Sequence, residues 1–277
     1  MVADRAVAVT ATPTPTLDER EVAQQAVPFV RKGLTSQSLY FSIEEIQSRM
    51  QLQHPDALDL RYTRTMMGFL MFLPAPGSIA MLGLGGGSLA KFCHRHLPQA
   101  RIDVAELNPR VIALRDVFRV PADSRRFRVV EADGARFIGA AERCYDVILL
   151  DAFGPKGLPR TLSSERFYDD CLDALNPDGL LVSNLHSAAP DRDDCVQRIA
   201  RSFASGVLLV EDREAGNSVV FARKGSRLEA KSPVRPRGFD EAAWRQLRGA
   251  FARIATALAR RDAAAAVAPD GVPRTAS

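Results

Sequence analysis

The residues best suited to chemistry are a glycine-rich segment and three acidic residues, each of which follows a run of apolar residues. Residues 83–88 read GLGGGS and join the apolar run 78–84 to a stretch with helical periodicity. Glycine lets a chain turn sharply and leaves no Cβ between the backbone and a ligand. The N-terminus of the following helix adds oriented N–H groups. Gly83, Gly85 and Gly87 are therefore candidate cofactor-binding residues, although tight strand-to-helix turns also use glycine for packing alone.

The spacing of these glycines and the position of the next acid indicate which cofactor could bind. The pattern is G-x-G-x-G, and Ser88 stands where a dinucleotide-binding G-x-G-x-x-G has its last glycine. This favours a donor built from adenosine and methionine over NAD. Glu106 follows at close to the ~20 residues that separate such a loop from a ribose-binding acid. Its carboxylate can accept hydrogen bonds from both ribose hydroxyls; the alternative is a solvated acid at the end of a strand.

Asp133 and Gly134 end the third apolar run, at residues 127–132. The Asp133 carboxylate could accept a hydrogen bond from an adenine amino group, and Gly134 would let the next helix begin close to the ring. The alternative is that Asp133 is a helix N-cap, a position that aspartate fills well. The two interpretations are compatible.

Asp151 ends the fourth apolar run and is followed by the Gly- and Pro-rich segment 152–162. The carboxyl end of a central strand lies beside the ligand crevice of an open α/β sheet. A carboxylate there could take a proton from an attacking amine or hold a cationic substrate. The alternative is a loop cap, but the segment that follows is suited to close over a site, which favours a functional role.

The order of elements predicts an α/β fold. Apolar strands alternate with helices, which indicates parallel pairing with both faces of the sheet buried. The last two strands instead flank a Gly216-Asn217 hairpin signal. A parallel sheet that ends in an antiparallel hairpin distinguishes this chain from a doubly wound dehydrogenase. The expected strands are 78–84, 101–107, 127–132, 145–151, 179–185, 207–212 and 218–223, and the expected helices are 62–73, 89–97, 109–118, 163–175, 191–203 and 240–261, with a turn at 176–179.

Four segments are expected along the chain. Residues 1–25 are rich in Ala, Thr and Pro and predict a disordered leader. Residues 26–73 predict a small β-rich region plus a helix, 74–225 a donor-binding domain, and 226–277 a linker, a C-terminal helix and a frayed tail. That helix carries an apolar face whose docking on its own domain is favoured over a homodimer seam: Trp244, Leu247, Phe251, Ile254 and Leu258.

Composition excludes several classes. Apolar residues make up 46% and charged residues 25% of the chain. No apolar run reaches the ~20 residues of a membrane span, and no secretory signal is evident, so a cytoplasmic location is expected. The net charge of +4 comes from scattered arginines, which argues against a nucleic-acid or membrane partner. The four cysteines form no CxxC pair, so no metal site is expected.

Several segments together resemble the spermidine synthase family of aminopropyltransferases, a branch of the class I methyltransferase fold with a Rossmann-like core. The resemblance covers about residues 39–221 and is carried by MLGLGGGSLAKF, VAELNPRVI, VVEADGARF, DVILLDAFGP and LNPDGLLVSNL. It implies a small N-terminal β domain, donor contacts at the glycine loop, a ribose contact at Glu106 and an adenine contact at Asp133. It also implies that Asp151 is the catalytic aspartate and that Tyr62 is the tyrosine preceding the acceptor loop.

Three positions depart from the family's motifs. Ser88 replaces the aspartate of GGGDG, Gly154 replaces the second acid of D-x-x-D, and Arg64 replaces the glutamate that follows the tyrosine, with Thr63 between them. Acids at these positions would bind cationic amino groups, and Arg64 in that wall would repel a polyamine.

The predicted function is transfer of an alkyl (aminopropyl) group to a small-molecule acceptor. The donor is S-adenosylmethionine or its decarboxylated form. The alternatives are a methyltransferase, which the lost acid at Ser88 favours, and a non-catalytic nucleoside-binding module, which retention of Asp151 disfavours.

Overall fold

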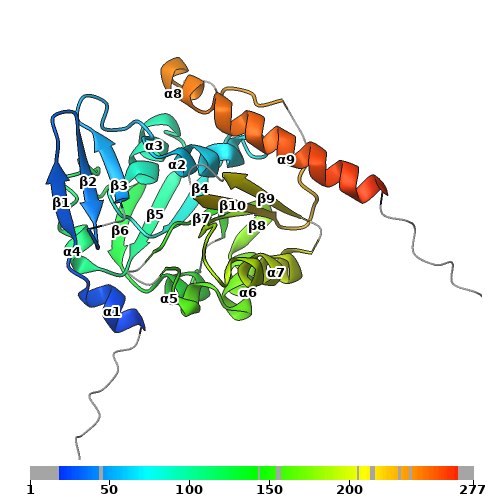
Figure 1. Ribbon diagram of the computed structural model, residues 1–277, viewed down its shortest axis with the longest axis horizontal. Coiled ribbons are helices and arrows are strands. Elements are labelled where there is room, and N and C mark those ends of the chain that lie inside the picture. Colours follow the sequence, from blue (N-terminus) through cyan, green and yellow to red (C-terminus); the bar gives the residue numbers. More distant parts are fainter. Residues whose placement is uncertain are drawn as a thin grey trace, which may run out of the picture.

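The N-terminal part of the chain forms a small antiparallel sheet. The structure is a computed structural model that describes residues 19–43, 46–142, 144–153, 157–204, 206–212, 216–229, 232–236 and 239–267. After helix α1 (Glu19–Gln25), the strands β1 (Phe29–Lys32), β2 (Ser36–Tyr40) and β3 (Ile46–Gln51) pair in chain order (Figure 1). The predicted β-rich region is therefore a three-stranded sheet.

The second sheet has seven strands in the order β6-β5-β4-β7-β8-β10-β9. The first five strands in this order are parallel, and β10 runs antiparallel to both of its neighbours. This confirms the predicted α/β Rossmann-like core that ends in an antiparallel hairpin. The strands are β4 (Ser78–Leu82), β5 (Arg101–Glu106), β6 (Phe127–Glu131), β7 (Tyr145–Leu150), β8 (Leu175–His186), β9 (Val207–Asp212) and β10 (Asn217–Arg223).

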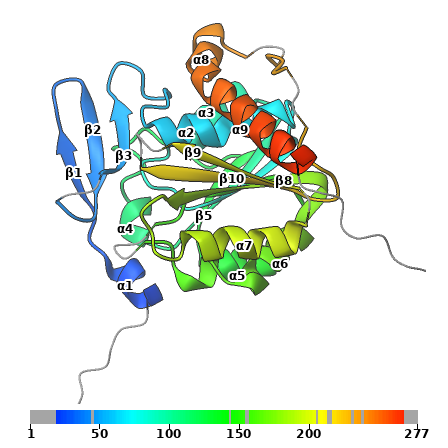
Figure 2. The same ribbon diagram turned by 45° about the vertical axis from the view of Figure 1, so that its right-hand side comes forward.

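Helices cover both faces of this sheet, because its strands are apolar on both faces. Side chains alternate along a strand, so Ile79 and Met81 of β4 join one buried cluster while Ala80 and Leu82 join the other. Figure 2 shows α5, α6 and α7 on one face and α2, α3 and α9 on the opposite face. The helices are α2 (Arg61–Met66), α3 (Ser88–His96), α4 (Pro109–Ile112), α5 (Gly134–Gly139), α6 (Glu165–Asp173), α7 (Arg192–Phe203), α8 (Glu241–Gln246) and α9 (Arg248–Val267), with 3₁₀ turns η1 (Met67–Met71) and η2 (Arg160–Leu162).

The C-terminal helix docks on its own domain. Leu247, Ile254 and Leu258 are 0% exposed. Gly68 in η1 leaves the space for this contact, because a Cβ there would overlap the Ile254 side chain. The apolar face predicted from the sequence is thus buried within the chain.

The structure differs from the expected boundaries in several places. The expected helix 109–118 ends at Ile112, the expected helix 62–73 is α2 followed by the 3₁₀ turn η1, and the expected helix 240–261 is divided into α8 and α9 at Leu247. Residues 19–25 of the predicted leader form α1, whose end is held by Asn108 through its Nδ2 hydrogen bonds to the carbonyls of Ala23 and Ala26. The predicted turn at 176–179 lies within β8. The C-terminal helix, expected to end at residue 261 before a frayed tail, continues to Val267, as the high helix propensity of the alanines in this stretch allows. Residues 1–18 and 268–277 lie outside the described part, and no described helix is long and apolar enough to cross a membrane.

The docking of α9 can be tested by removing one buried side chain. Ile254→Ala should lower the free energy of unfolding by about 2–5 kcal/mol, because it leaves a cavity in a packed core. Urea denaturation measures the change. Arg260→Ala, an exposed position on the same helix, should change it by no more than about 0.5 kcal/mol. Equal effects of the two substitutions would contradict the docking.

Candidate active site

The glycine loop crosses the carboxyl edge of the sheet between β4 and α3. Gly83 has φ +95° and lies so close to the Asp151 carbonyl that a Cβ would overlap it. Gly85 and Gly87 also have positive φ, at +52° and +67°, a conformation that glycine adopts without a steric cost. Gly87 precedes the first turn of α3 and approaches Val120 rather than the cavity described below. Of the three glycines, Gly83 and Gly85 line that cavity.

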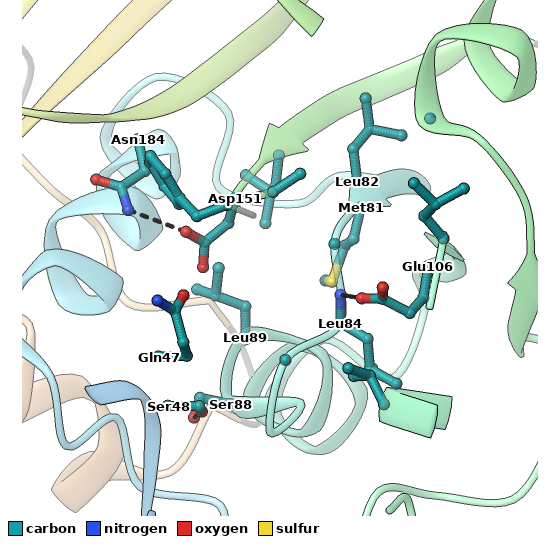
Figure 3. Close-up of a pocket in the computed structure, with 18 of the residues that line it drawn as sticks. Gln47, Ser48, Met81, Leu82, Leu84, Ser88, Leu89, Glu106, Asp151 and Asn184 are labelled. Atoms are coloured by element: carbon teal, nitrogen blue, oxygen red, sulfur yellow. Dashed lines mark hydrogen bonds between the residues drawn. The ribbon is translucent and has the colours of Figure 1, made fainter. Parts of the chain in front are cut away.

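Glu106 is the last residue of β5, and the glycine loop orients its carboxylate. Its Oε2 accepts a hydrogen bond from the Leu84 N–H at 2.8 Å (Figure 3). Its Oε1 accepts one from the Asn108 N–H at 2.9 Å. Burial raises the pKa of Glu106, and these backbone N–H groups oppose that rise. Each carboxylate oxygen has a second lone pair, so Glu106 can also accept hydrogen bonds from a ligand.

Asp133 caps α5, and it also lies on the cavity wall. Its Oδ1 accepts a hydrogen bond from the Arg136 N–H at 2.9 Å. Gly134 follows it, and a Cβ there would lie 3.3 Å from the Leu162 side chain. The N-cap interpretation is confirmed, and the adenine contact remains a prediction.

Asp151 directly follows β7 and is held by two side chains. Its Oδ1 accepts a hydrogen bond from Asn184 Nδ2 at 2.9 Å, and its Oδ2 accepts one from the Tyr62 hydroxyl at 3.2 Å. Figure 3 shows the Asn184 amide directed at the carboxylate. Burial raises the pKa of Asp151, while both hydrogen bonds and nearby His186 lower it. Burial and the Asp151 charge raise the pKa of Tyr62 well above its ordinary value, so Tyr62 stays protonated and donates.

These residues share one cavity of about 470 Å³. Its wall contains seven of the eight predicted site residues, all except Gly87. The cavity is large enough for a drug-sized ligand. The seven are Tyr62, Gly83, Gly85, Glu106, Asp133, Gly134 and Asp151.

The sequence did not identify the amide and hydroxyl groups that complete the wall. Asn184 lies inside the apolar segment of β8, between Ser183 and Leu185, and as an uncharged residue it carries no signal that separates it from an ordinary buried amide. Asn217 reaches the cavity only because β10 runs antiparallel, which brings its first residue to the same edge. Ser48 of β3 reaches across from the small sheet, and its Oγ lies 3.3 Å from Ser88 Oγ.

The interpretation that Arg64 stands in the cavity wall is wrong. Arg64 Nε donates to the Leu58 carbonyl at 2.7 Å, and Arg64 is not among the described residues that line the cavity. Successive residues in a helix are ~100° apart, so a side chain two positions after Tyr62 points to the opposite side. The cavity-lining arginines are Arg49, ion-paired with Asp59, and Arg61, ion-paired with Asp212. Gly154 lies outside the described residues.

Comparison with known proteins identifies the family. Residues 59–202 match the spermine/spermidine synthase domain. The chain belongs to this family. A polyamine aminopropyltransferase of Neisseria meningitidis (serogroup A) is 38% identical over 194 residues, which cover 69% of this chain and 74% of the relative. These matches confirm the predicted resemblance and the predicted class of enzyme, an aminopropyltransferase-like transferase.

Solved structures of family members share the fold. A probable spermidine synthase from Corynebacterium glutamicum superposes with a TM-score of 0.66 at 20% identity, over 96% of this chain and all of that one. A spermidine synthase in complex with the transition-state analogue AdoDATO gives a TM-score of 0.53 at 21% identity, over 79% of this chain and 78% of that one. The small sheet and the seven-stranded sheet are therefore the architecture of the spermidine synthase family.

The contact between Tyr62 and Asp151 predicts the direction of a pKa change. Tyr62→Phe removes a hydroxyl that donates to the carboxylate, so the pKa of Asp151 should rise further. The measurement is a pH titration of the Asp151 carboxyl ¹³C shift. Tyr40→Phe, a change in the small sheet, serves as the control and should leave that pKa unchanged. An unchanged or lowered pKa in Tyr62→Phe would contradict the contact.

Proposed function

We propose that this protein transfers the aminopropyl group of decarboxylated S-adenosylmethionine to the primary amine of a small molecule. The observation that carries the proposal is the place of Asp151 and Tyr62 in the cavity. On one side of this pair lie the glycine loop, Glu106 and Asp133, which suit a nucleoside. On the other side lie Asn184 and neighbouring polar groups, which suit an acceptor.

The donor half fits the two polar parts of an adenosine. Glu106 would accept hydrogen bonds from the two ribose hydroxyls, which is the role of an acid at this strand end. Asp133 would accept one from the adenine amino group, because a carboxylate has two oxygens with about four lone-pair sites. Gly85 lets the backbone pass close to the ligand, because nothing extends from its Cα into the cavity.

The reaction is a direct displacement at the carbon next to the donor sulfonium. The amine lone pair forms the new N–C bond, the C–S bond breaks, and its electron pair returns to sulfur, which leaves methylthioadenosine. The ammonium product loses its proton to the Asp151 carboxylate. Burial raises the pKa of Asp151, which makes its carboxylate a stronger base. Since sulfur is already a good leaving group, the protein mainly aligns the nitrogen with the carbon.

Methyl transfer from S-adenosylmethionine is the second candidate, and Ser88 is the observation that favours it. The carboxylated donor must place an anion near the start of α3, where Ser88 and Ser48 present hydroxyls. A hydroxyl does not repel that anion as an aspartate would. The family membership supports aminopropyl transfer instead, and donor binding separates the two.

Donor binding can be measured by calorimetry with S-adenosylmethionine, its decarboxylated form and methylthioadenosine. We expect tightest binding of the decarboxylated donor. Glu106→Ala should weaken nucleoside binding about tenfold to hundredfold, because it removes a charged hydrogen-bond acceptor. Glu131→Ala is the matched control: Glu131 ends the neighbouring strand opposite Glu106 and is exposed. Preference for the carboxylated donor would overturn aminopropyl transfer, and unchanged affinity in Glu106→Ala would overturn the ribose contact.

Turnover with putrescine tests the role of Asp151. Asp151→Asn should lower kcat about 10²- to 10⁴-fold, the range for loss of a general base, and release of methylthioadenosine measures it. In the wild type, kcat should fall as the pH drops through the pKa of Asp151, above the ordinary value of ~3.9. Asp173→Asn on the exposed surface of α6 should keep full activity. Full activity in Asp151→Asn would exclude its catalytic role.

A further inference from the structure

A chain of hydrogen bonds crosses three neighbouring strands and ends on Asp151. Asn217, at the start of β10, donates from Nδ2 to Asn184 Oδ1 at 3.1 Å. Asn184 in β8 donates in turn from Nδ2 to Asp151 Oδ1 at 2.9 Å. The Asn184 amide cannot hydrogen-bond to bulk solvent instead, because this residue is only 2% exposed. Asn217 and Asp151 both line the cavity.

The topology of the sheet creates this chain. Leu150 of β7 pairs with Ser183 of β8, which puts the following residues, Asp151 and Asn184, side by side. Asn217 of β10 pairs with His186 of β8 and therefore stands diagonally beside Asn184. A parallel strand beside β8 would end at the carboxyl edge of the sheet and place its last residue there. Because β10 is antiparallel, it begins at this edge and places its first residue, Asn217, there.

The chemistry of the groups fixes the direction of each hydrogen bond. An ionised carboxylate only accepts, so the Asn184 NH₂ must face Asp151 and its oxygen must face Asn217. The two ends of an amide have nearly the same shape, so packing alone does not distinguish them. A flipped amide would set its oxygen against the carboxylate. In the structure Asn217 Nδ2 donates to the Asn184 oxygen, which is the arrangement that keeps the Asn184 NH₂ toward Asp151.

We propose that Asn217 is a positioning residue that holds the Asn184 amide with its donor toward Asp151. Asp151 Oδ1 is then occupied, and Oδ2, shared with Tyr62, is the oxygen that receives the acceptor's proton. This inference rests on the proposed function, in which Asp151 is the base. It adds a residue that contacts the base only through another side chain.

The groups around Asp151 and Asn217 determine whether a change in the pKa of Asp151 in an Asn217 variant could have another cause. Tyr62 approaches from α2, and nearby His186 of β8 lowers the pKa of Asp151. On its other side Asn217 pairs with Asp212, whose carboxylate is ion-paired with Arg61 and Arg253. A neutral substitution at Asn217 adds no charge beside these groups. Its direct effect is therefore on the hydrogen-bond chain.

A double-mutant cycle tests the chain, with Asn217→Leu, Asn184→Leu and both together. Leucine is close to asparagine in shape and cannot hydrogen-bond. Asn217→Leu should raise the pKa of Asp151, read from its carboxyl ¹³C titration in the resting protein, because the amide is no longer held as a donor. It should lower kcat about threefold to tenfold and leave the KM for the acceptor unchanged. In the Asn184→Leu background the same substitution should have no further effect on either the pKa or kcat.

Three outcomes would overturn the proposal. The pKa could stay unchanged in Asn217→Leu, the effects of the two substitutions could add, or only KM could rise, which would make Asn217 an acceptor contact. Asn176→Leu, which breaks a similar Asn–Asp pair with Asp146, is the control and should leave the Asp151 pKa unchanged. The pKa cycle requires no turnover. An inactive wild type would thus refute the proposed function alone, and an unchanged pKa would refute the positioning role alone.

Discussion

The site depends on the closeness of Gly83 to the backbone of Asp151. The two residues follow neighbouring parallel strands, and a single Cβ would not fit between them. This contact joins the loop that would hold the donor to the carboxylate that would take the proton. Neither residue can move along the sheet edge without the other, because β4 and β7 are hydrogen-bonded along their length. In the proposed function, the distance between donor and base would therefore be set by the sheet rather than by flexible side chains.

Burial at this edge of the sheet disfavours the charged form of the carboxylates, and the surrounding hydrogen-bond donors oppose this effect. Glu106 and Asp151 both have pKa values raised by burial. Each receives hydrogen bonds that oppose this rise: backbone N–H groups donate to Glu106, and Asn184 and Tyr62 donate to Asp151. The two acids thus receive different partners, and the difference suits different tasks. Backbone N–H donors are rigid, which suits Glu106 as a proposed binding group. Side-chain donors can shift with the charge of their partner, which suits Asp151 as a proposed proton acceptor.

The sequence predicts the acidic part of this site well and its neutral part poorly. Glu106, Asp133 and Asp151 stand out because each ends an apolar strand, and the parallel order of the strands brings them to one edge. Asn184 lies inside a similar apolar segment and carries no charge, so nothing distinguishes it from an ordinary buried amide. Asn217 depends on the register of an antiparallel pair, which no local pattern specifies.

Two errors of prediction, at Arg64 and at residues 176–179, have different physical origins. Arg64 follows Tyr62 closely in the sequence, but the helix rotates it away from the cavity. The segment 176–179 has turn-forming residues, yet it is drawn into β8, where Lys224 N–H donates to the Gly179 carbonyl at 2.9 Å. The first error follows from the rotation of ~100° per residue in a helix, whereas in the second a tertiary contact overrides a local turn signal.

The docking of α9 bears on the order in which the molecule can be assembled. Arg253 of α9 donates to Thr65 of α2 at 2.9 Å, across 188 positions of sequence. The helix that carries Tyr62 is thus braced by the element that follows every other described element in the chain. During synthesis the sheet edge, the glycine loop and Asp151 emerge well before this brace does. In a nascent chain, Glu106, Asp133 and Asp151 could therefore come together before Tyr62 is held in place. The position of Tyr62 would be fixed only after α9 has left the ribosome.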